Sequence, residues 1–120
     1  MKNLAFVIED QPDVSVTFLR ALVEAGFQPQ IIPNRREALS RLEMESPSLV
    51  ILDVSLPEVD GGRILGFIRE HEHLASTKVI MATEDPEQIS VVSSHQADLF
   101  LQKPITYTQM RDFAQRYKSG

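Results

Sequence analysis

Five polar residues of this sequence stand at the ends of apolar runs, where their side chains could act together. They are Glu9, Asp10, Asp53, Thr83 and Lys103. Carboxylates gathered in one place repel one another and raise each other's pKa unless a cation lies between them. Mg2+ is a hard cation that binds carboxylate and carbonyl oxygens, keeps several waters and accepts phosphate oxygens as further ligands. The three acidic residues therefore predict a magnesium site.

Lys103 and Thr83 extend this prediction from metal binding to phosphoryl chemistry. An ammonium and a hydroxyl directed at one pocket are the donors that the oxygens of a phosphoryl group need. Asp53 could itself act as the nucleophile and form an aspartyl phosphate. The candidate magnesium ligands are all oxygen donors: Glu9, Asp10, Asp53 and the backbone carbonyl of Ser55.

Alternating strands and helices are expected to bring these residues together. Short apolar runs bounded by polar or turn residues predict five strands, at residues 4–9, 28–33, 48–53, 78–83 and 98–103. Helix-period segments separate these runs. Strand and helix patterns that alternate five times predict an α/β protein with a parallel sheet covered by helices on both faces.

Helical periodicity fills the intervals between the predicted strands. Apolar residues spaced by three and four predict a helix over 13–26, with Gly26 in the left-handed conformation that often ends a helix. Asn34 is expected to cap a second helix that Pro47 ends, and Asp60 to cap a third. The remaining helices are predicted near 86–95 and over about 106–118.

The order of the strands decides whether the polar residues meet. In an open parallel sheet, ligands bind beyond the carboxyl ends of the strands, where the strand order reverses. With the flavodoxin-like order 2-1-3-4-5, Glu9, Asp10 and Asp53 meet at that point. Thr83 and Lys103 then flank them on the fourth and fifth strands. We therefore predict a doubly wound, five-stranded parallel sheet of this order.

Composition and charge exclude several other classes of protein. The 120 residues, 42% of them hydrophobic, predict one domain over 1–120, with 117–120 as a tail or the start of a linker. The absence of cysteine excludes disulfides, a thiol nucleophile and zinc–thiolate sites. A net charge of −5 without a basic run argues against direct binding of nucleic acid. No signal peptide and no apolar window of roughly 18 residues is present, so a cytoplasmic protein that does not enter the membrane is expected.

Four motifs of the chain resemble those of the receiver domain of two-component response regulators. They are VIED after the first predicted strand, ILDVSLPEVDG at the third, IMAT at the end of the fourth and ADLFLQKP at the fifth. The motifs occur in the expected order at compatible spacings. The resemblance covers about residues 3–118, which is nearly the whole chain.

This resemblance implies a role for each candidate residue. Asp53 would accept a phosphoryl group from a histidine of a sensor kinase or of a histidine phosphotransfer protein, in a Mg2+-dependent reaction, and would later lose it by hydrolysis. Asp10 would bind the metal directly, and Glu9 would act through a water molecule. Lys103 would pair with the phosphoryl oxygens, and Thr83 would move to hydrogen-bond them.

The resemblance also implies a signalling switch rather than an enzyme with its own substrate. Phe100 would be the aromatic residue whose rotamer is coupled to Thr83, and Pro104 would follow a cis peptide bond. The fourth helix, fifth strand and fifth helix would form the output face. That face would act on an output domain, on a downstream protein or in a homodimer that forms on phosphorylation.

Four positions bear on how closely the chain follows the family. Glu84 stands where a small residue is usual, and its anionic side chain would hinder access of a donor or shield the phosphoryl group. Ser55 and Asp85 occupy positions that tune dephosphorylation in the family. Gln96 replaces a usual glycine, so a trimmed or irregular fourth helix is expected.

Three alternative interpretations stay open. A receiver-like interaction module that is not phosphorylated is favoured by Glu84. It is opposed by the intact Asp53, Thr83 and Lys103. A phosphatase of the haloacid dehalogenase type needs a second acid two residues after its nucleophile, where this chain has Ser55. A flavin or nucleotide binder needs a glycine-rich loop after the first strand, where EDQPD stands.

Two nearby histidines offer a weaker metal motif. His71 and His73 are two residues apart on the predicted third helix, so their side chains would not share a helix face. We therefore predict solvated side chains rather than a pair of metal ligands.

Overall fold

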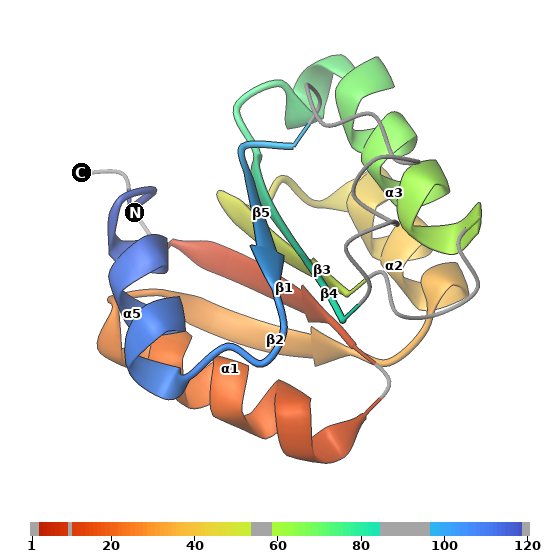
Figure 1. The fold of residues 1–120 in the computed structure, drawn as a ribbon. Helices are drawn as coiled ribbons and strands as arrows, with labels where there is room; N and C mark the ends of the chain where they lie inside the picture. The colour runs from red at the N-terminus through yellow and green to blue at the C-terminus, as the bar shows by residue number, and fades with distance from the viewer. Residues whose placement is uncertain (1–2, 10, 54–58, 85–96, 119–120) are drawn as a thin grey trace.

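The computed structural model describes residues 3–9, 11–53, 59–84 and 97–118. Strands and helices alternate along the chain (Figure 1). In chain order they are β1 (Leu4–Ile8), α1 (Pro12–Glu24), β2 (Gln28–Ile32), α2 (Arg35–Met44), β3 (Leu49–Asp53), α3 (Val59–Glu70), the 3-10 helix η1 (Glu72–Leu74), β4 (Lys78–Thr83), β5 (Leu99–Gln102) and α5 (Tyr107–Gln115).

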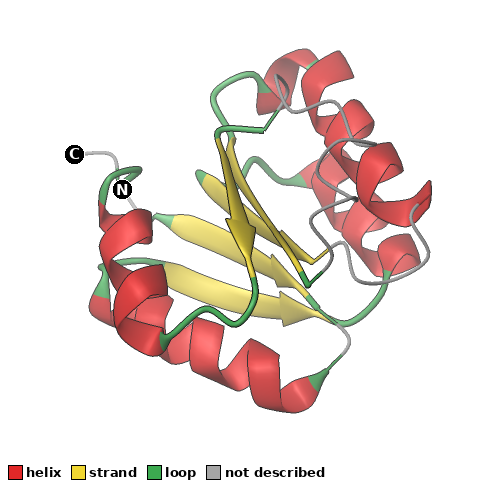
Figure 2. Ribbon diagram, viewed as in Figure 1, coloured by secondary structure: helices red, strands yellow, loops and turns green. Residues whose placement is uncertain are grey.

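The five strands form one parallel sheet of order β2-β1-β3-β4-β5 (Figure 2). This confirms the order 2-1-3-4-5 predicted from the sequence. The chain moves outward from β1 to β2 and then returns past β1 to β3, so the strand order reverses between β1 and β3. A sheet of this kind places its ligand crevice there, at the carboxyl ends of the strands.

Helices cover both faces of the sheet, as predicted. Figure 1 shows α1 and α5 on one face and α2 and α3 on the other. Successive strand residues point to opposite faces, so β1 supplies Phe6 and Ile8 to the core under α2 and α3, and Ala5 and Val7 to the core under α1 and α5. The central strand β1 therefore contributes side chains to both cores.

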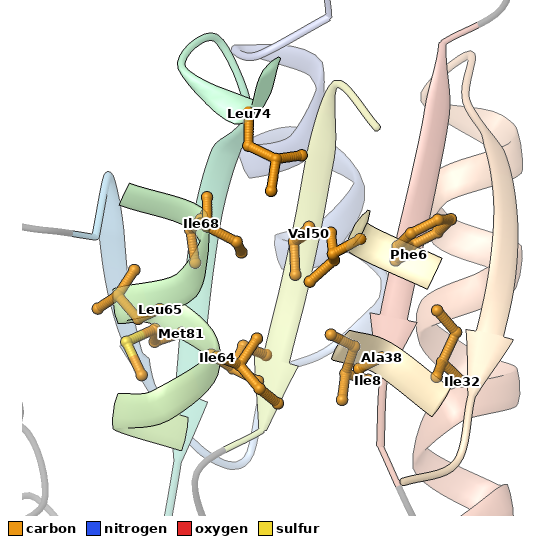
Figure 3. Packing of buried hydrophobic residues seen from close by; sticks show 13 residues of the cluster. Phe6, Ile8, Ile32, Ala38, Val50, Ile64, Leu65, Ile68, Leu74 and Met81 are labelled. Carbon is orange, nitrogen blue, oxygen red and sulfur yellow. The ribbon is translucent and has the colours of Figure 1, made fainter. Parts of the chain in front are cut away.

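The core under α2 and α3 is built mainly from aliphatic side chains of the strands and of these two helices (Figure 3). Val50 and Met81 from the strands are fully buried, and Ile64 and Ile68 from α3 are at most 2% exposed. Close packing on both faces keeps the strand ends in register with one another. The carboxyl edge of the sheet is thus a rigid support for the residues that follow it.

The helix ends agree with the sequence signals at several positions. Asn34 caps α2, where its side-chain oxygen accepts a hydrogen bond from the Glu37 N–H at 2.9 Å. Gly26 follows α1 with φ of 100°, the left-handed conformation predicted for it. Thr106 caps α5 through a reciprocal capping box with Gln109.

Several predicted helix boundaries differ from the observed ones by a few residues. Helix α1 ends at Glu24 rather than at Gly26, and α5 ends at Gln115 rather than near residue 118. Helix α3 begins at Val59, so Asp60 lies inside its first turn instead of capping it. Helix α2 ends at Met44, three residues before Pro47, which agrees with the prediction that Pro47 ends this helix. The helix predicted near 86–95 and the position of Gln96 lie outside the described residues.

The predicted solvated side chain is found at His73, which is exposed, whereas His71 is half-buried. His71 follows the last residue of α3 and stacks on Phe67 with ring centroids 3.8 Å apart, while its Nδ1 lies 2.7 Å from the Phe67 carbonyl oxygen. His73 lies in η1, with Nε2 2.7 Å from the Leu42 carbonyl oxygen of α2. Both imidazoles therefore contact carbonyls in the last turn of a helix, where such contacts are favourable.

No helix within the described part of the chain is long and apolar enough to span a membrane.

Candidate functional site

The predicted site residues that the structure describes gather at the carboxyl edge of the sheet. Asp53 is the last residue of β3 and is the register partner of Ala82 in β4. Thr83 ends β4 and is fully buried. Glu9 follows β1, where its N–H donates to the Ile32 carbonyl of β2 at 3.1 Å. The strand lengths therefore bring these three residues to one edge, as the switch-point rule predicts.

Lys103 is held at the same edge by the backbone of β4. Its N–H donates to the Thr83 carbonyl at 2.7 Å, which continues the pairing of β4 with β5 beyond Gln102. The following Lys103–Pro104 peptide bond is cis, as the resemblance implied. Lys103 is thus anchored at its backbone, and its side chain is the part that can reach across the edge.

A buried ion pair joins Lys103 to Glu9. The Lys103 Nζ lies 3.2 Å from Glu9 Oε1, and the two side chains are 7% and 1% exposed. The other carboxylate oxygen of Glu9, Oε2, accepts a hydrogen bond from the Gln11 N–H at 3.3 Å. Charges buried to this extent are rarely found without such partners.

The strand order shows which strand ends the Glu9–Lys103 ion pair spans. Glu9 follows β1 and Lys103 follows β5, and β3 and β4 lie between these two strands. Neighbouring strands are about 4.8 Å apart, so β1 and β5 are separated by roughly 14 Å. The paired side chains therefore extend over the ends of β3 and β4, where Asp53 and Thr83 are located.

Sequence reasoning did not predict this direct contact. It placed Lys103 beside phosphoryl oxygens and Glu9 beside a metal ion. The signal for this contact in the sequence was the opposite charge of two residues that follow predicted strands. Because the two strands are three strand spacings apart, the contact also depends on the twist of the sheet and on the length of the lysine side chain, which the sequence pattern does not give.

Thr83 and Phe100 lie on the same face of the sheet. Thr83 is two residues beyond Met81, and Met81 is the register partner of Phe100 in β5. Because side chains alternate between faces, Thr83, Met81 and Phe100 all belong to the face covered by α2 and α3. Phe100 is half-buried and packs against the core on that side.

A hollow of about 600 Å3 opens beside Lys103, between α1 and the segments that follow β4 and β5. Half of its lining residues are apolar and the other half are polar or charged: Val14, Phe18, Pro104 and Ile105, and Asp13, Thr17, Glu84 and Lys103. Glu84 is exposed. The sequence predicted Val14 and Phe18 only as members of the apolar face of a helix. That pattern does not show which residues of the face also line a hollow.

Several predicted members of the site lie outside the described residues: Asp10, Ser55 and Asp85. Among the residues that the structure describes, no group of three histidine, aspartate or glutamate residues could hold a metal ion. The described residues supply the buried carboxylate of Glu9, at the edge of the sheet where β3 ends with Asp53. Carboxylate oxygens are ligands that fit Mg2+.

Polar contacts between α1 and α5 support the segment that carries Lys103. Tyr107, the first residue of α5, donates its hydroxyl to Glu24 of α1, and Arg111 pairs with the same carboxylate at 3.0 Å. The Tyr107 hydrogen bond and the Arg111 contact lower the pKa of Glu24 below its ordinary value of 4.5. The same hydrogen bond raises the pKa of Tyr107. These contacts link the start of α5 to the end of α1.

Comparisons with known proteins bear on what this edge does. The family model of the response regulator receiver domain matches residues 5–115. An uncharacterized 14.6 kDa protein in the sodA1 3' region of Leptolyngbya boryana is 31% identical over 114 residues, which cover 92% of this chain and 86% of that protein. The response regulator Rre1 of Synechocystis sp. is 31% identical over 101 residues, which cover 82% of this chain and 44% of Rre1.

A solved structure shares both the fold and part of the sequence. The response regulator protein TrrA from Thermotoga maritima, in complex with Mg2+-BeF, is 26% identical, with a TM-score of 0.83 over 98% of this chain and 100% of that chain. This chain spans less than half the length of several curated relatives that it matches, Rre1 among them. Because the family model matches most of the sequence and the strand order agrees with it, the chain belongs to the response regulator receiver domain family.

Proposed function

We propose that this receiver domain accepts a phosphoryl group on Asp53 from a phosphohistidine of a sensor kinase or of a histidine phosphotransfer protein, in a Mg2+-dependent reaction. The observation that carries the proposal is the buried Lys103 ammonium, held 3.2 Å from Glu9 at the edge where β3 ends in Asp53. A buried cation beside carboxylates suits a site that receives a dianionic group. The similar protein TrrA was solved in complex with Mg2+-BeF, which supports a dependence on Mg2+.

The proposed reaction is a nucleophilic displacement at phosphorus. A carboxylate oxygen of Asp53 forms the new P–O bond while the P–N bond to the donor histidine breaks. The electron pair of the P–N bond returns to the imidazole nitrogen. Hydrolysis later breaks the acyl phosphate, and water supplies the oxygen that leaves with inorganic phosphate.

The residues of this chain would bind and orient the phosphoryl group. Lys103 donates charge-assisted hydrogen bonds to its oxygens, which stabilises the negative charge that Asp53 receives. Mg2+, when bound, neutralises further charge on the same oxygens. The residues that would hold it are the predicted oxygen ligands: Glu9, Asp10, Asp53 and the Ser55 carbonyl.

The proposed output is a shift between two conformations coupled through Thr83 and Phe100. Thr83 is buried at the end of β4, and Phe100 lies on the same sheet face, half-buried in β5. A hydroxyl that moves toward the phosphoryl group leaves space on this face, and an aromatic ring can occupy that space. Phosphorylation would then favour one of two conformations that already exist.

The second candidate function is an interaction module that is not phosphorylated. Glu84 favours it, because this exposed carboxylate lines the hollow beside Lys103 and would repel an anionic donor. A module of this kind would use the same surface for binding without transfer of a phosphoryl group.

One experiment separates the two functions. The protein is incubated with Mg2+ and acetyl phosphate, and in parallel with a phosphorylated histidine phosphotransfer protein, and intact masses are compared for wild type, Asp53→Asn and the matched surface variant Asp112→Asn. We expect a gain of one phosphoryl group in wild type and in Asp112→Asn, and its loss on treatment with hydroxylamine. An adduct that persists in Asp53→Asn would contradict the proposed phosphoacceptor. No adduct from either donor would favour the interaction module.

A further inference from the structure

The imidazole rings of His71 and His73 approach each other in the segment between α3 and β4. Their centroids are 5.9 Å apart, and the planes of the rings meet at 81°. Residues two apart on one helix would not face each other. Here α3 ends at Glu70, and His71 has an extended backbone before η1 begins. This change of backbone conformation between the two residues brings their rings together.

Each of the two rings has one nitrogen that must carry a proton. A carbonyl oxygen only accepts hydrogen bonds, so His71 Nδ1 donates to the Phe67 carbonyl and His73 Nε2 donates to the Leu42 carbonyl, both at 2.7 Å. A neutral imidazole has a single N–H, which leaves the lone pairs on His71 Nε2 and His73 Nδ1. Histidines that bind metals almost always have this arrangement, in which the other ring nitrogen donates to a carbonyl or a carboxylate.

We propose that His71 and His73 together bind one divalent metal ion of the Zn2+ or Ni2+ class, at a site separate from the proposed Mg2+ site. Zn–N bonds are about 2.0–2.1 Å long, so two imidazoles on one ion have centroids about 5–6 Å apart. The separation of 5.9 Å lies within that range. Imidazole nitrogen suits Zn2+ and Ni2+, whereas Mg2+ prefers oxygen ligands. This site does not depend on phosphorylation of Asp53.

The surroundings of the two rings leave room for an ion and hold the rings in place. His73 is exposed and borders a hollow of about 220 Å3. His71 is held from one side by Phe67, with ring centroids 3.8 Å apart. No group of three metal-binding side chains is found among the residues that the structure describes. Water would therefore occupy the remaining coordination positions, as it does in open zinc sites.

The charges near the two rings also favour a cation. The carbonyls that the rings contact lie in the last turns of α2 and α3, where a helix carries partial negative charge. Two exposed carboxylates, Glu70 and Glu72, adjoin the pair along the chain. The cations closest to the pair in sequence, Arg69 and Lys78, both pair with Asp98. A divalent ion at the two imidazoles therefore meets more negative than positive charge.

Isothermal titration calorimetry with Zn2+ and with Ni2+ tests the site. Millimolar Mg2+ is present throughout, so that oxygen ligands at the carboxyl edge of the sheet do not contribute. The variants are His71→Gln and His73→Gln, in which an amide N–H can still donate to the backbone carbonyl. His95→Gln is the matched control, because it removes the third histidine of the chain, and Asp53→Asn tests independence from the proposed phosphoacceptor. Far-UV circular dichroism shows which variants fold.

We expect wild type to bind one ion per chain. His71→Gln and His73→Gln should each weaken binding at least about tenfold, since even residues that only orient a metal ligand contribute that much. His95→Gln and Asp53→Asn should bind as wild type does. Failure of wild type to bind either metal would overturn the inference, and so would an equal loss in His95→Gln. A loss in Asp53→Asn would assign the ion to the carboxyl edge instead. Phosphorylation of Asp53 is measured separately, so a negative result here leaves the proposed function standing.

NMR of the wild-type protein covers the case in which a variant does not fold. The ring nitrogens of 15N-labelled histidine report the tautomers directly. In the metal-free protein we expect His71 to carry its proton on Nδ1 and His73 on Nε2. Added Zn2+ should then shift His71 Nε2 and His73 Nδ1 and leave His95 unmoved. Opposite tautomers, or ring signals of this pair that do not move at saturating Zn2+, would contradict the proposal.

Discussion

Removal of Lys103 should destabilise the fold far more than removal of another lysine. In the metal-free protein, Lys103→Met leaves the carboxylate of Glu9 buried, with the Gln11 N–H as the contact on its other oxygen. At an effective dielectric constant of about 20, charges 3.2 Å apart attract by roughly 5 kcal/mol, which offsets the cost of their desolvation. Breaking such a pair from one side typically costs about 3 kcal/mol.

Urea unfolding without Mg2+ measures this effect. We expect Lys103→Met to lower the free energy of unfolding by about 3 kcal/mol, which corresponds to roughly 10 °C in melting temperature. The double variant Glu9→Gln/Lys103→Met should recover at least half of that loss, because both buried charges are then removed. The Lys78 side chain is 49% exposed, and its ammonium lies 4.0 Å from Asp98, so Lys78→Met should change the free energy of unfolding by less than about 0.5 kcal/mol.

Two outcomes would refute this reasoning. If Lys103→Met and Lys78→Met lowered the free energy of unfolding equally, the buried pair would contribute no more than a surface contact. If the losses in the two single variants simply added in the double variant, Glu9 and Lys103 would not interact energetically.

Three further predictions concern the elements that support the site. Asn34→Ala should lower the free energy of unfolding by about 1 kcal/mol through loss of the α2 cap, and a change below 0.3 kcal/mol in urea unfolding would contradict the role of the cap. Gly26→Ala should lower the free energy of unfolding by about 1–2 kcal/mol, because φ is +100° and a Cβ would lie 2.6 Å from the Lys118 Nζ. Adding Lys118→Ala should restore only part of this free energy. Full recovery would show that the backbone conformation itself costs nothing. Glu24 has a pKa below its ordinary 4.5 in the fold, so its stabilising effect is present above that pH and is lost as the pH falls through the lowered pKa. The difference in melting temperature between wild type and Glu24→Gln should therefore shrink in acid, and a constant difference would contradict the charged contact.

Local sequence patterns were sufficient for most of the fold. Apolar runs such as KVIMAT predicted strands within one residue of their observed ends, because a central parallel strand is buried on both faces and is apolar throughout. Asn34 and Gly26 were predicted correctly since a cap and a left-handed residue depend on near neighbours. Asp60 was misplaced because the signals for the first turn of a helix and for its cap overlap.

Distant packing decided the features that were missed. The rings of His71 and His73 contact carbonyls of α3 and α2, and the second of these contacts joins residues 31 apart in the chain. A pattern within one helix contains no information about a neighbouring helix, so the contact of His73 with Leu42 was not predicted. The stacking of His71 on Phe67, four residues earlier, is a local contact that the solvated interpretation overlooked.

The sequence by itself determined which residues stand at the carboxyl edge of the sheet, because strand length and strand order place Glu9, Asp53 and Lys103 there. Only the tertiary structure decided which of them touch. Sheet twist and the burial of two long side chains bring the Lys103 ammonium to Glu9 across two intervening strands. An ion pair between residues 94 positions apart depends on the whole sheet, and no local pattern encodes it.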